Sequence, residues 1–251
     1  MIDILLAGVG GQGTVLAAKV LAQAAQSKGW QVRTAETIGM AQRGGNVTSH
    51  VRMGSNGEAV FSPLITPGTA DMVIALEPGE AARALPFLAP GGVLVTATTT
   101  IQSVTAALSS MPYRAGDVVA ALANTLQAEA MREQAAEAAV GLGPAQAAAG
   151  GDDTPASSQG TAQIAGQDAQ APGVEGYPVP LFVPVDDEAL VREAGKGGRK
   201  ALNMMLLAVA VAQGRVPLTV NELKEAVEAC VKPQFVAMNL AAIDTAVEVY
   251  G

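Results

Sequence analysis

The sequence predicts an α/β fold: a three-layer, Rossmann-like sandwich with a mainly parallel sheet, a β-hairpin and C-terminal helices. Two observations carry this prediction. Short, continuous apolar runs, beginning with residues 2–7, are typical of strands that are covered on both faces. These runs alternate with longer segments in which polar residues recur at helical spacing, beginning with residues 14–28. Such alternation indicates a parallel sheet with helices packed against it.

The first part of the chain predicts a strand–helix–strand unit followed by the hairpin. Gly29 ends the first helix, and residues 30–36 have the composition of the second strand. Residues 47–53 alternate between two faces, and residues 54–57 carry a tight-turn signal. Residues 58–64 are therefore expected to return beside the preceding strand as the other arm of the hairpin.

The remaining elements follow from the same two periodicities and from helix-start signals. Pro78 suits the first position of a helix, so Glu77 is expected to start that helix. Asp186 and Asp187 are placed to cap another, and Thr219 with Glu222 forms a capping-box pattern. Strands are expected at residues 71–76, 93–98 and 178–185, and helices at 79–88, 117–140, 187–195, 201–213, 220–230 and 236–247.

Composition predicts one domain spanning residues 1–251 that carries a low-complexity, disordered insertion at about 141–176. The insertion is rich in Ala, Gly, Gln, Ser, Pro and Asp, and it can bury too little apolar area to offset its ordering entropy. Hydrophobic residues make up 49% of the chain and aromatic residues only 3%, so aliphatic side chains and methionine must build the core.

Charge and cysteine content exclude several classes of function. The net charge is -8 and no basic run occurs, which argues against binding to nucleic acid or to an anionic membrane. The single cysteine, Cys230, rules out an internal disulfide, and with one histidine, His50, the chain alone cannot hold a zinc ion or an iron–sulfur cluster. With no signal peptide recognised and no apolar run of membrane-spanning length, we expect a cytoplasmic protein.

A glycine-rich turn follows the first strand and matches the spacing Gly8-x-Gly10-x-x-Gly13. Such a turn exposes backbone N–H groups at a helix start, where an anionic group is favoured. A phosphate-loop NTPase is excluded, because Thr14 and Val15 follow where Lys and Ser or Thr would be required. An NAD site remains open, with Glu36 as the acidic partner, and so does a tight turn that binds no ligand.

A second glycine-rich loop changes the balance between these hypotheses. GVGGQG (8–13) and GMAQRGG (39–45), followed by SHVR (49–52), resemble the γ-type subunit or domain of 2-oxoacid:ferredoxin oxidoreductases. The likeness is greatest to the small β subunits of the indolepyruvate-specific branch. ADMVIALEP (70–78) and Asn203 within a buried helix also match.

The resemblance implies a subunit that is inactive alone and completes the active site of a heteromeric enzyme. That enzyme oxidises 2-oxo acids such as indolepyruvate to acyl-CoA and carbon dioxide, with ferredoxin as electron acceptor. A large α subunit holds thiamine diphosphate, Mg and [4Fe-4S] clusters, while CoA is a co-substrate. The residues that we expect to bind cofactor or CoA are Gly8, Gly10, Gly11, Gln12, Gly13, Met40, Gln42, Arg43, Gly44 and Gly45.

Individual side chains leave alternatives open. Arg43 suits a CoA phosphate, a substrate carboxylate or a salt bridge to the partner subunit. His50 falls on the polar face of its strand, where a surface or interface role is expected, and Cys230 is expected in the core. No residue is assigned as catalytic and none as a metal ligand. The alternatives for the whole chain are a free-standing NAD(P)-binding Rossmann oxidoreductase and a non-catalytic interaction subunit.

Overall fold

The computed structural model describes five stretches of the chain, and the sheet that they form has six strands. The described residues are 1–39, 45–55, 57–101, 114–141 and 180–251. The strands are β1 (Ile2–Val9), β2 (Gln31–Ile38), β3 (Asn46–Gly54), β4 (Ala70–Ala75), β5 (Leu88–Ala97) and β6 (Leu181–Val185).

The sheet is mixed but mostly parallel, with the strand order β2-β3-β1-β4-β5-β6. Strands β1, β4, β5 and β6 pair in parallel, each with its neighbour. Strand β3 is antiparallel to both β1 and β2, and it separates these two strands. The opening strand–helix–strand unit is confirmed, but its two strands are neighbours of β3 and not of each other.

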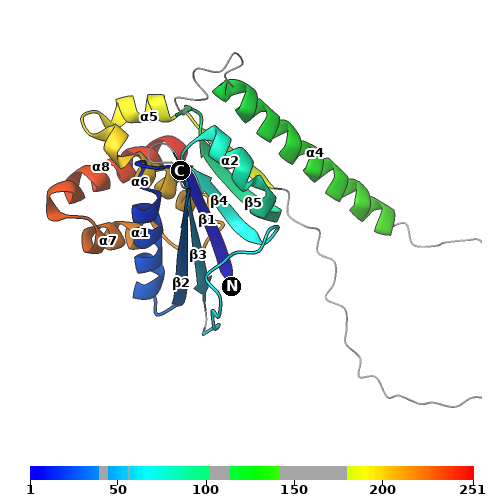
Figure 1. Ribbon diagram of the computed structural model, residues 1–251, viewed down its shortest axis with the longest axis horizontal. Coiled ribbons are helices and arrows are strands. Elements are labelled where there is room, and N and C mark those ends of the chain that lie inside the picture. The colour runs from blue at the N-terminus through cyan, green and yellow to red at the C-terminus, as the bar shows by residue number, and fades with distance from the viewer. Residues whose placement is uncertain (40–44, 56, 102–113, 142–179) are drawn as a thin grey trace, which may run out of the picture.

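Helices cover both faces of the sheet, which confirms the predicted three layers (Figure 1). Helices α1, α6, α7 and α8 pack on one face, and α2 and α4 lie on the other. A short 3-10 turn, Leu85–Phe87, follows α2. The helices are α1 (Thr14–Ser27), α2 (Pro78–Ala84), α4 (Ala115–Gly141), α5 (Asp187–Ala194), α6 (Gly198–Ala212), α7 (Val220–Cys230) and α8 (Pro233–Tyr250).

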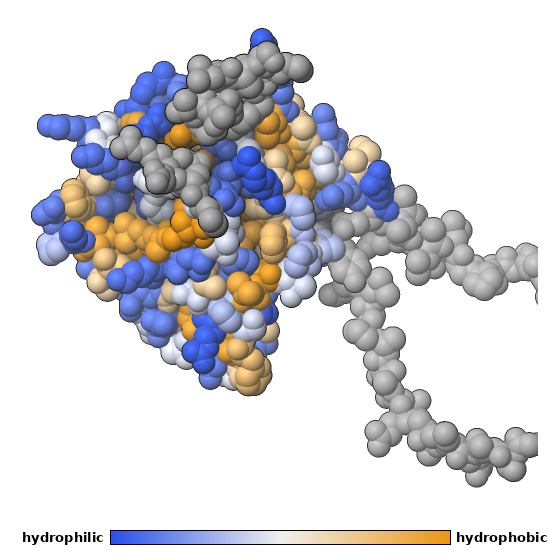
Figure 2. Space-filling view, viewed as in Figure 1, coloured by the Kyte–Doolittle hydropathy of each residue, from blue (hydrophilic) through white to orange (hydrophobic). Residues whose placement is uncertain are grey.

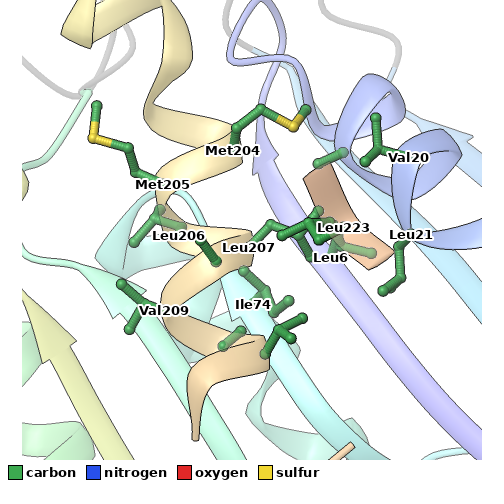
Figure 3. Packing of buried hydrophobic residues seen from close by; sticks show 14 of the residues in the cluster. Leu6, Val20, Leu21, Ile74, Met204, Met205, Leu206, Leu207, Val209 and Leu223 are labelled. Atoms are coloured by element: carbon green, nitrogen blue, oxygen red, sulfur yellow. The ribbon is translucent and has the colours of Figure 1, made fainter. Parts of the chain in front are cut away.

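Successive residues of β1 point to opposite faces and so contribute to two separate hydrophobic clusters. Ile4 and Leu6 pack with α1 and α6, whereas Leu5 and Ala7 pack with α2 and α4. Helix α6 is the centre of the larger cluster, and Met204 to Leu207 lie on its buried turns (Figure 3). A helix that is apolar all round belongs in such a core. On the outer face shown in Figure 2, hydrophobic residues form patches between hydrophilic ones.

The predicted helix-start signals are confirmed in detail. The Glu77 carboxylate accepts a hydrogen bond from the Glu80 N–H at the start of α2, with Pro78 in the first turn. Asp186 caps α5 by accepting from the Ala189 N–H. Thr219 and Glu222 form both bonds of a capping box at α7.

The predicted hairpin over residues 47–64 is wrong in its second arm, because residues 57–64 contain no strand. Its first arm is β3, whose two edges are both occupied by other strands. Arg52 of β3 donates hydrogen bonds to the carbonyl groups of Ser62 and Leu64, so this segment packs against the sheet through side chains. The turn signal at 54–57 therefore marks the end of β3, and the segment that follows it is not a strand.

One prediction concerns a part of the chain that the structure does not describe. The predicted insertion at 141–176 lies outside the described residues, apart from residue 141 at the end of α4. Within the described ranges, no helix is both long and apolar enough to cross a membrane.

Candidate functional site

The turn between β1 and α1 has the predicted strand–turn–helix geometry. Gly11 and Gly13 have positive φ angles of 98° and 83°, which side-chain-bearing residues adopt at a cost. The N–H groups of Gly10 and Gln12 donate to Gly45 and Val9, at 2.8 and 3.1 Å. In the described part of the chain, the N–H groups of Gly11 and Gly13 meet no backbone acceptor.

The side chain of Gln12 braces the turn from within. Its Oε1 accepts a hydrogen bond from the Val9 N–H at 2.6 Å, and its Nε2 donates to the Leu76 carbonyl at 2.7 Å. These bonds join the ends of β1 and β4 at the carboxyl edge of the sheet. Gln12 was expected to present its N–H to a ligand, but both its backbone and its side chain hold the loop in shape.

The two glycine-rich loops meet at one hydrogen bond. The Gly10 N–H donates to the Gly45 carbonyl at 2.8 Å, and a Cβ at Gly10 would lie 3.6 Å from that oxygen. The loops identified separately in the sequence are thus neighbours in space. Four other residues of the predicted site, Met40, Gln42, Arg43 and Gly44, lie outside the described residues, so their roles stay predictions.

Helix α6 reaches the glycine turn through Asn203. The Asn203 Nδ2 donates to the Gly13 carbonyl at 3.0 Å, although Asn203 is buried among apolar residues of the helix, Ala201 to Ala212. A Cβ at Gly13 would lie 2.6 Å from this nitrogen. Gly13 is therefore required both by its positive φ and by close packing against α6, which is the predicted role of the last glycine.

A cavity of about 150 Å³ opens beside the turn, beyond the carboxyl ends of β1, β4, β5 and β6. The chain leaves β1 toward α1 on one face and leaves β4 toward α2 on the other. This is the topological switch point, where open α/β sheets bind ligands. The residues that line this cavity, which we call the crevice, are Gly11, Gln12, Leu76, Thr99, Ile101, Asp187, Arg199 and Leu202.

Sequence reasoning missed the charged pair in the crevice. The Arg199 Nη1 donates to the Asp187 Oδ2 at 3.1 Å, and the Thr99 N–H donates to the Asp187 Oδ1 at 2.8 Å. Asp187 had been assigned only to capping. A signal was present, because GKGGRK (195–200) is a third glycine-rich turn before a helix, with positive φ at Gly195 and Gly197.

A second cavity, of about 160 Å³, lies on the opposite face of the sheet near α2. Glu80 and Arg83, which form an ion pair one helical turn apart, both line it. Burial of the Glu80 carboxyl raises its pKa, and Arg83 opposes this rise only in part. The charges of this cavity are thus paired locally within α2.

The prediction for His50 is wrong, because this side chain is buried. Its Nδ1 accepts a hydrogen bond from the Ile65 N–H at 3.2 Å, and its ring meets Phe87 edge to face. The segment that was expected to be a strand covers this side of β3 and removes His50 from solvent. Burial lowers the His50 pKa.

Cys230 and Glu77 are placed near their expected positions. Cys230 is only partly buried, at the margin of the larger cluster, so the prediction of a core position was too strong. Burial raises the pKa of its thiol. Glu77 is buried at the start of α2, where the Thr100 hydroxyl also donates to its Oε1 at 2.6 Å.

The strand order weighs against the NAD hypothesis. In dinucleotide-binding folds, the second strand lies next to the first, so the acid at its end reaches the ribose. Here β3 lies between β1 and β2, and Glu36 is exposed on the edge strand. Neighbouring strands lie about 4.8 Å apart, so the strand that carries Glu36 is about 10 Å from β1 across the sheet.

The fold and the crevice define the class: an α/β domain whose glycine turns line a switch-point site. The chain belongs to the pyruvate ferredoxin/flavodoxin oxidoreductase family, whose model matches residues 3–249. It is 46% identical to the indolepyruvate oxidoreductase subunit IorB of Archaeoglobus fulgidus over 113 residues, or 44% of this chain and 54% of that protein. IorB of Pyrococcus horikoshii is 37% identical over 111 residues, with the same two shares. The chain therefore spans about half the length of these curated relatives.

Solved structures share the fold. The γ subunit of a keto/oxoacid ferredoxin oxidoreductase from Geobacter sulfurreducens has a TM-score of 0.54 at 19% identity, covering 99% of this chain and 97% of that one. A 2-oxoglutarate:ferredoxin oxidoreductase from Magnetococcus marinus, solved with 2-oxoglutarate, coenzyme A and succinyl-CoA bound, has a TM-score of 0.56 at 17% identity. All of this chain is covered there, but only 31% of the longer one. The predicted α/β fold is confirmed.

Proposed function

We propose that this chain is a subunit of a 2-oxoacid:ferredoxin oxidoreductase that acts on arylpyruvates such as indolepyruvate. The complex decarboxylates the 2-oxo acid, passes two electrons to ferredoxin and joins the remaining acyl group to CoA. The observation that carries the proposal is the Gly10–Gly45 hydrogen bond, which joins two family-typical loops beside a switch-point crevice. Similarity to the IorB proteins supports the choice of an arylpyruvate.

In this proposal the chain binds and orients, while a larger partner subunit provides the redox centres. Iron–sulfur clusters require a set of thiolates, and the chain has one cysteine. Among the described residues, no group of three or more His, Cys, Asp or Glu side chains could hold a metal ion. Thiamine diphosphate, bound by the partner with its Mg, supplies the electron sink for decarboxylation. The N–H groups of Gly11 and Gly13 orient an anionic ligand, and the loops exclude water from it.

Exposed apolar side chains at the crevice edge support a protein partner. Val15 lies in the first turn of α1, Ile38 ends β2, and Ile101 follows β5, so all three lie at the carboxyl edge of the sheet. Their exposed fractions are 42%, 67% and 47%. Exposed apolar residues along one edge of a sheet are typical of a surface that another protein covers.

Co-expression with the large subunit tests the proposal. We expect the two chains to copurify, and the complex to reduce ferredoxin when given indolepyruvate and CoA. The isolated chain should not reduce ferredoxin, and it should show no NAD binding by calorimetry. Tight NAD binding by the chain alone would instead establish the Rossmann oxidoreductase alternative. A complex that assembles and is equally active without this chain's glycine loops would establish the interaction-subunit alternative.

A further inference from the structure

Arg199 is the cation of the crevice. It lies in the first turn of α6, and its side chain is 54% exposed although its partner Asp187 is only 2% exposed. One nitrogen, Nη1, binds Asp187. Within the described residues, Nε and Nη2 donate to no acceptor, so most of the guanidinium fork remains available.

Asp187 is suited to aim this guanidinium without cancelling its attraction for an anion. Its Oδ1 already accepts the Thr99 N–H, and it occupies the first position of α5, where the helix dipole favours a carboxylate. The negative charge of Asp187 is therefore balanced by two groups besides Arg199. Among the described residues that line the crevice, Asp187 is also the only acidic one.

The side chains that line the crevice are of two kinds, apolar and polar. Leu76, Ile101 and Leu202 form an apolar wall, while Arg199, Gln12 and Thr99 lie among the polar groups. Helices α1 and α6 both begin beside the crevice without a side-chain cap or an acid in the first turn. Helices α2, α5 and α7 are instead capped by Glu77, Asp186 and Thr219. The uncapped starts of α1 and α6 thus favour an anionic group at the crevice, and the acidic first turn of α5 opposes them.

We infer that Arg199, positioned by Asp187, binds the anionic oxygen group of a ligand whose apolar part lies along Leu76, Ile101 and Leu202. The inference rests on the proposed function and names the ligand chemistry of that same site. Two reactants of the complex carry such a group: CoA through its phosphates, and the 2-oxo acid through its carboxylate. A planar guanidinium with two free donors matches either group in a bidentate way.

Variants of the assembled complex test this inference and distinguish the two sources. Arg199→Ala should raise the KM of one reactant roughly 10- to 100-fold with little change in kcat, because a charge-assisted hydrogen bond is lost. A change confined to CoA assigns a phosphate, and a change confined to the 2-oxo acid assigns the carboxylate. Arg199→Lys keeps the charge but not the fork, so it should show a smaller rise. Arg192→Ala removes an exposed arginine from neighbouring α5 and should change neither KM.

A binding measurement separates failure of this inference from failure of the proposed function. The reactant that Arg199 recognises should raise the melting temperature of the wild-type complex, and less so that of Arg199→Ala. A thermal shift needs no turnover, so a shift caused by CoA remains informative even if the complex oxidises a different acid. Unchanged KM values and equal thermal shifts would overturn the inference. Loss of assembly in both Arg199 variants, with Arg192→Ala assembled, would also overturn it by making Arg199 an interface residue.

Discussion

The chain segments that leave β1 and β3 are both held by side chains, but by groups of different kinds. Residues 10–13 are fixed by neutral amides, from Gln12 within the turn and from Asn203 of α6. Residues 62–65 are held by ionisable side chains of the strand that they cover, Arg52 and His50. Both arrangements satisfy backbone groups that would otherwise lack partners.

This difference has a functional consequence. Neutral amides hold the glycine turn in one geometry whatever the pH or ionic strength, as the proposed ligand-binding role requires. The second segment depends on an ion pair and on the protonation state of an imidazole, so solution conditions can loosen it. We expect substitutions in the glycine turn to act through shape and those under the second segment to act through charge.

Gly13→Ala should have the largest effect of the changes that probe this contrast. A Cβ at this position costs about 1–2 kcal/mol for a left-handed backbone. It also displaces Asn203, which lies 2.6 Å from the Cβ position, and breaking that buried hydrogen bond costs about 1–3 kcal/mol more. Chemical denaturation should therefore show that the free energy of unfolding falls by about 2–5 kcal/mol.

Gly29→Ala is the matched control for this change. Gly29 has a similar φ of 77°, but nothing lies within 4 Å of its Cβ position. Gly29→Ala should lower the free energy of unfolding only by the backbone cost, about 1–2 kcal/mol. Equal losses in the two variants would mean that Asn203 moves away freely and does not hold the turn.

The sequence was sufficient for most of the fold, because strand and helix signals are local. Apolar runs, Pro78, Asp186 and the Thr219 capping box each act within a few residues, and each is confirmed. The hairpin failed because strand pairing is a long-range choice. Alternation at residues 47–53 identifies a strand but does not reveal that β1 and β2 occupy both its edges.

The site was predictable where its residues are contiguous and not where they are separate in sequence. The glycines of residues 8–13 are the turn itself, so their spacing predicts it. The Arg199–Asp187 pair joins α6 to α5, and Asn203 reaches a turn 190 residues away. The glycine-rich turn at 195–200 indicates a helix start, but the partner that each side chain meets depends on how the helices pack on the sheet.

Arg52→Gln should have an intermediate effect on the second segment. Arg52 pairs with the buried carboxylate of Asp3 at 3.0 Å and also donates to two carbonyls of the covering segment. Removing Arg52 leaves the buried Asp3 carboxylate without its cation, so the free energy of unfolding should fall by about 1–3 kcal/mol. Amide exchange should rise over residues 60–65 but not over the glycine turn.

The matched control for Arg52 is its neighbour on β2. Arg33 lies directly opposite Arg52 and makes one long bond, of 3.4 Å, to the Val60 carbonyl. Arg33→Gln should cost less than about 1 kcal/mol. If the two variants were equally stable, the segment would be held by its apolar contacts and not by Arg52.

Acidification should have the smallest effect, acting through His50. Burial lowers the pKa of this imidazole, so the folded state takes up its proton only at a lower pH than the unfolded chain. The contribution of neutral His50 to stability is fully present above the usual histidine pKa of about 6.5 and is lost as the pH falls below it. One proton limits the slope to about 1.4 kcal/mol per pH unit.

His50→Gln separates the pH dependence that is due to His50 from that of the carboxyl groups. Glutamine can still accept from the Ile65 N–H but does not titrate. Burial raises the Glu80 pKa, so Glu80 favours folding as the pH falls, and it does so in both proteins. The difference in unfolding free energy between wild type and His50→Gln, followed from pH 7 to pH 5, should therefore report His50 alone. A difference that does not change with pH would show that the imidazole is protonated without disturbing the segment above it.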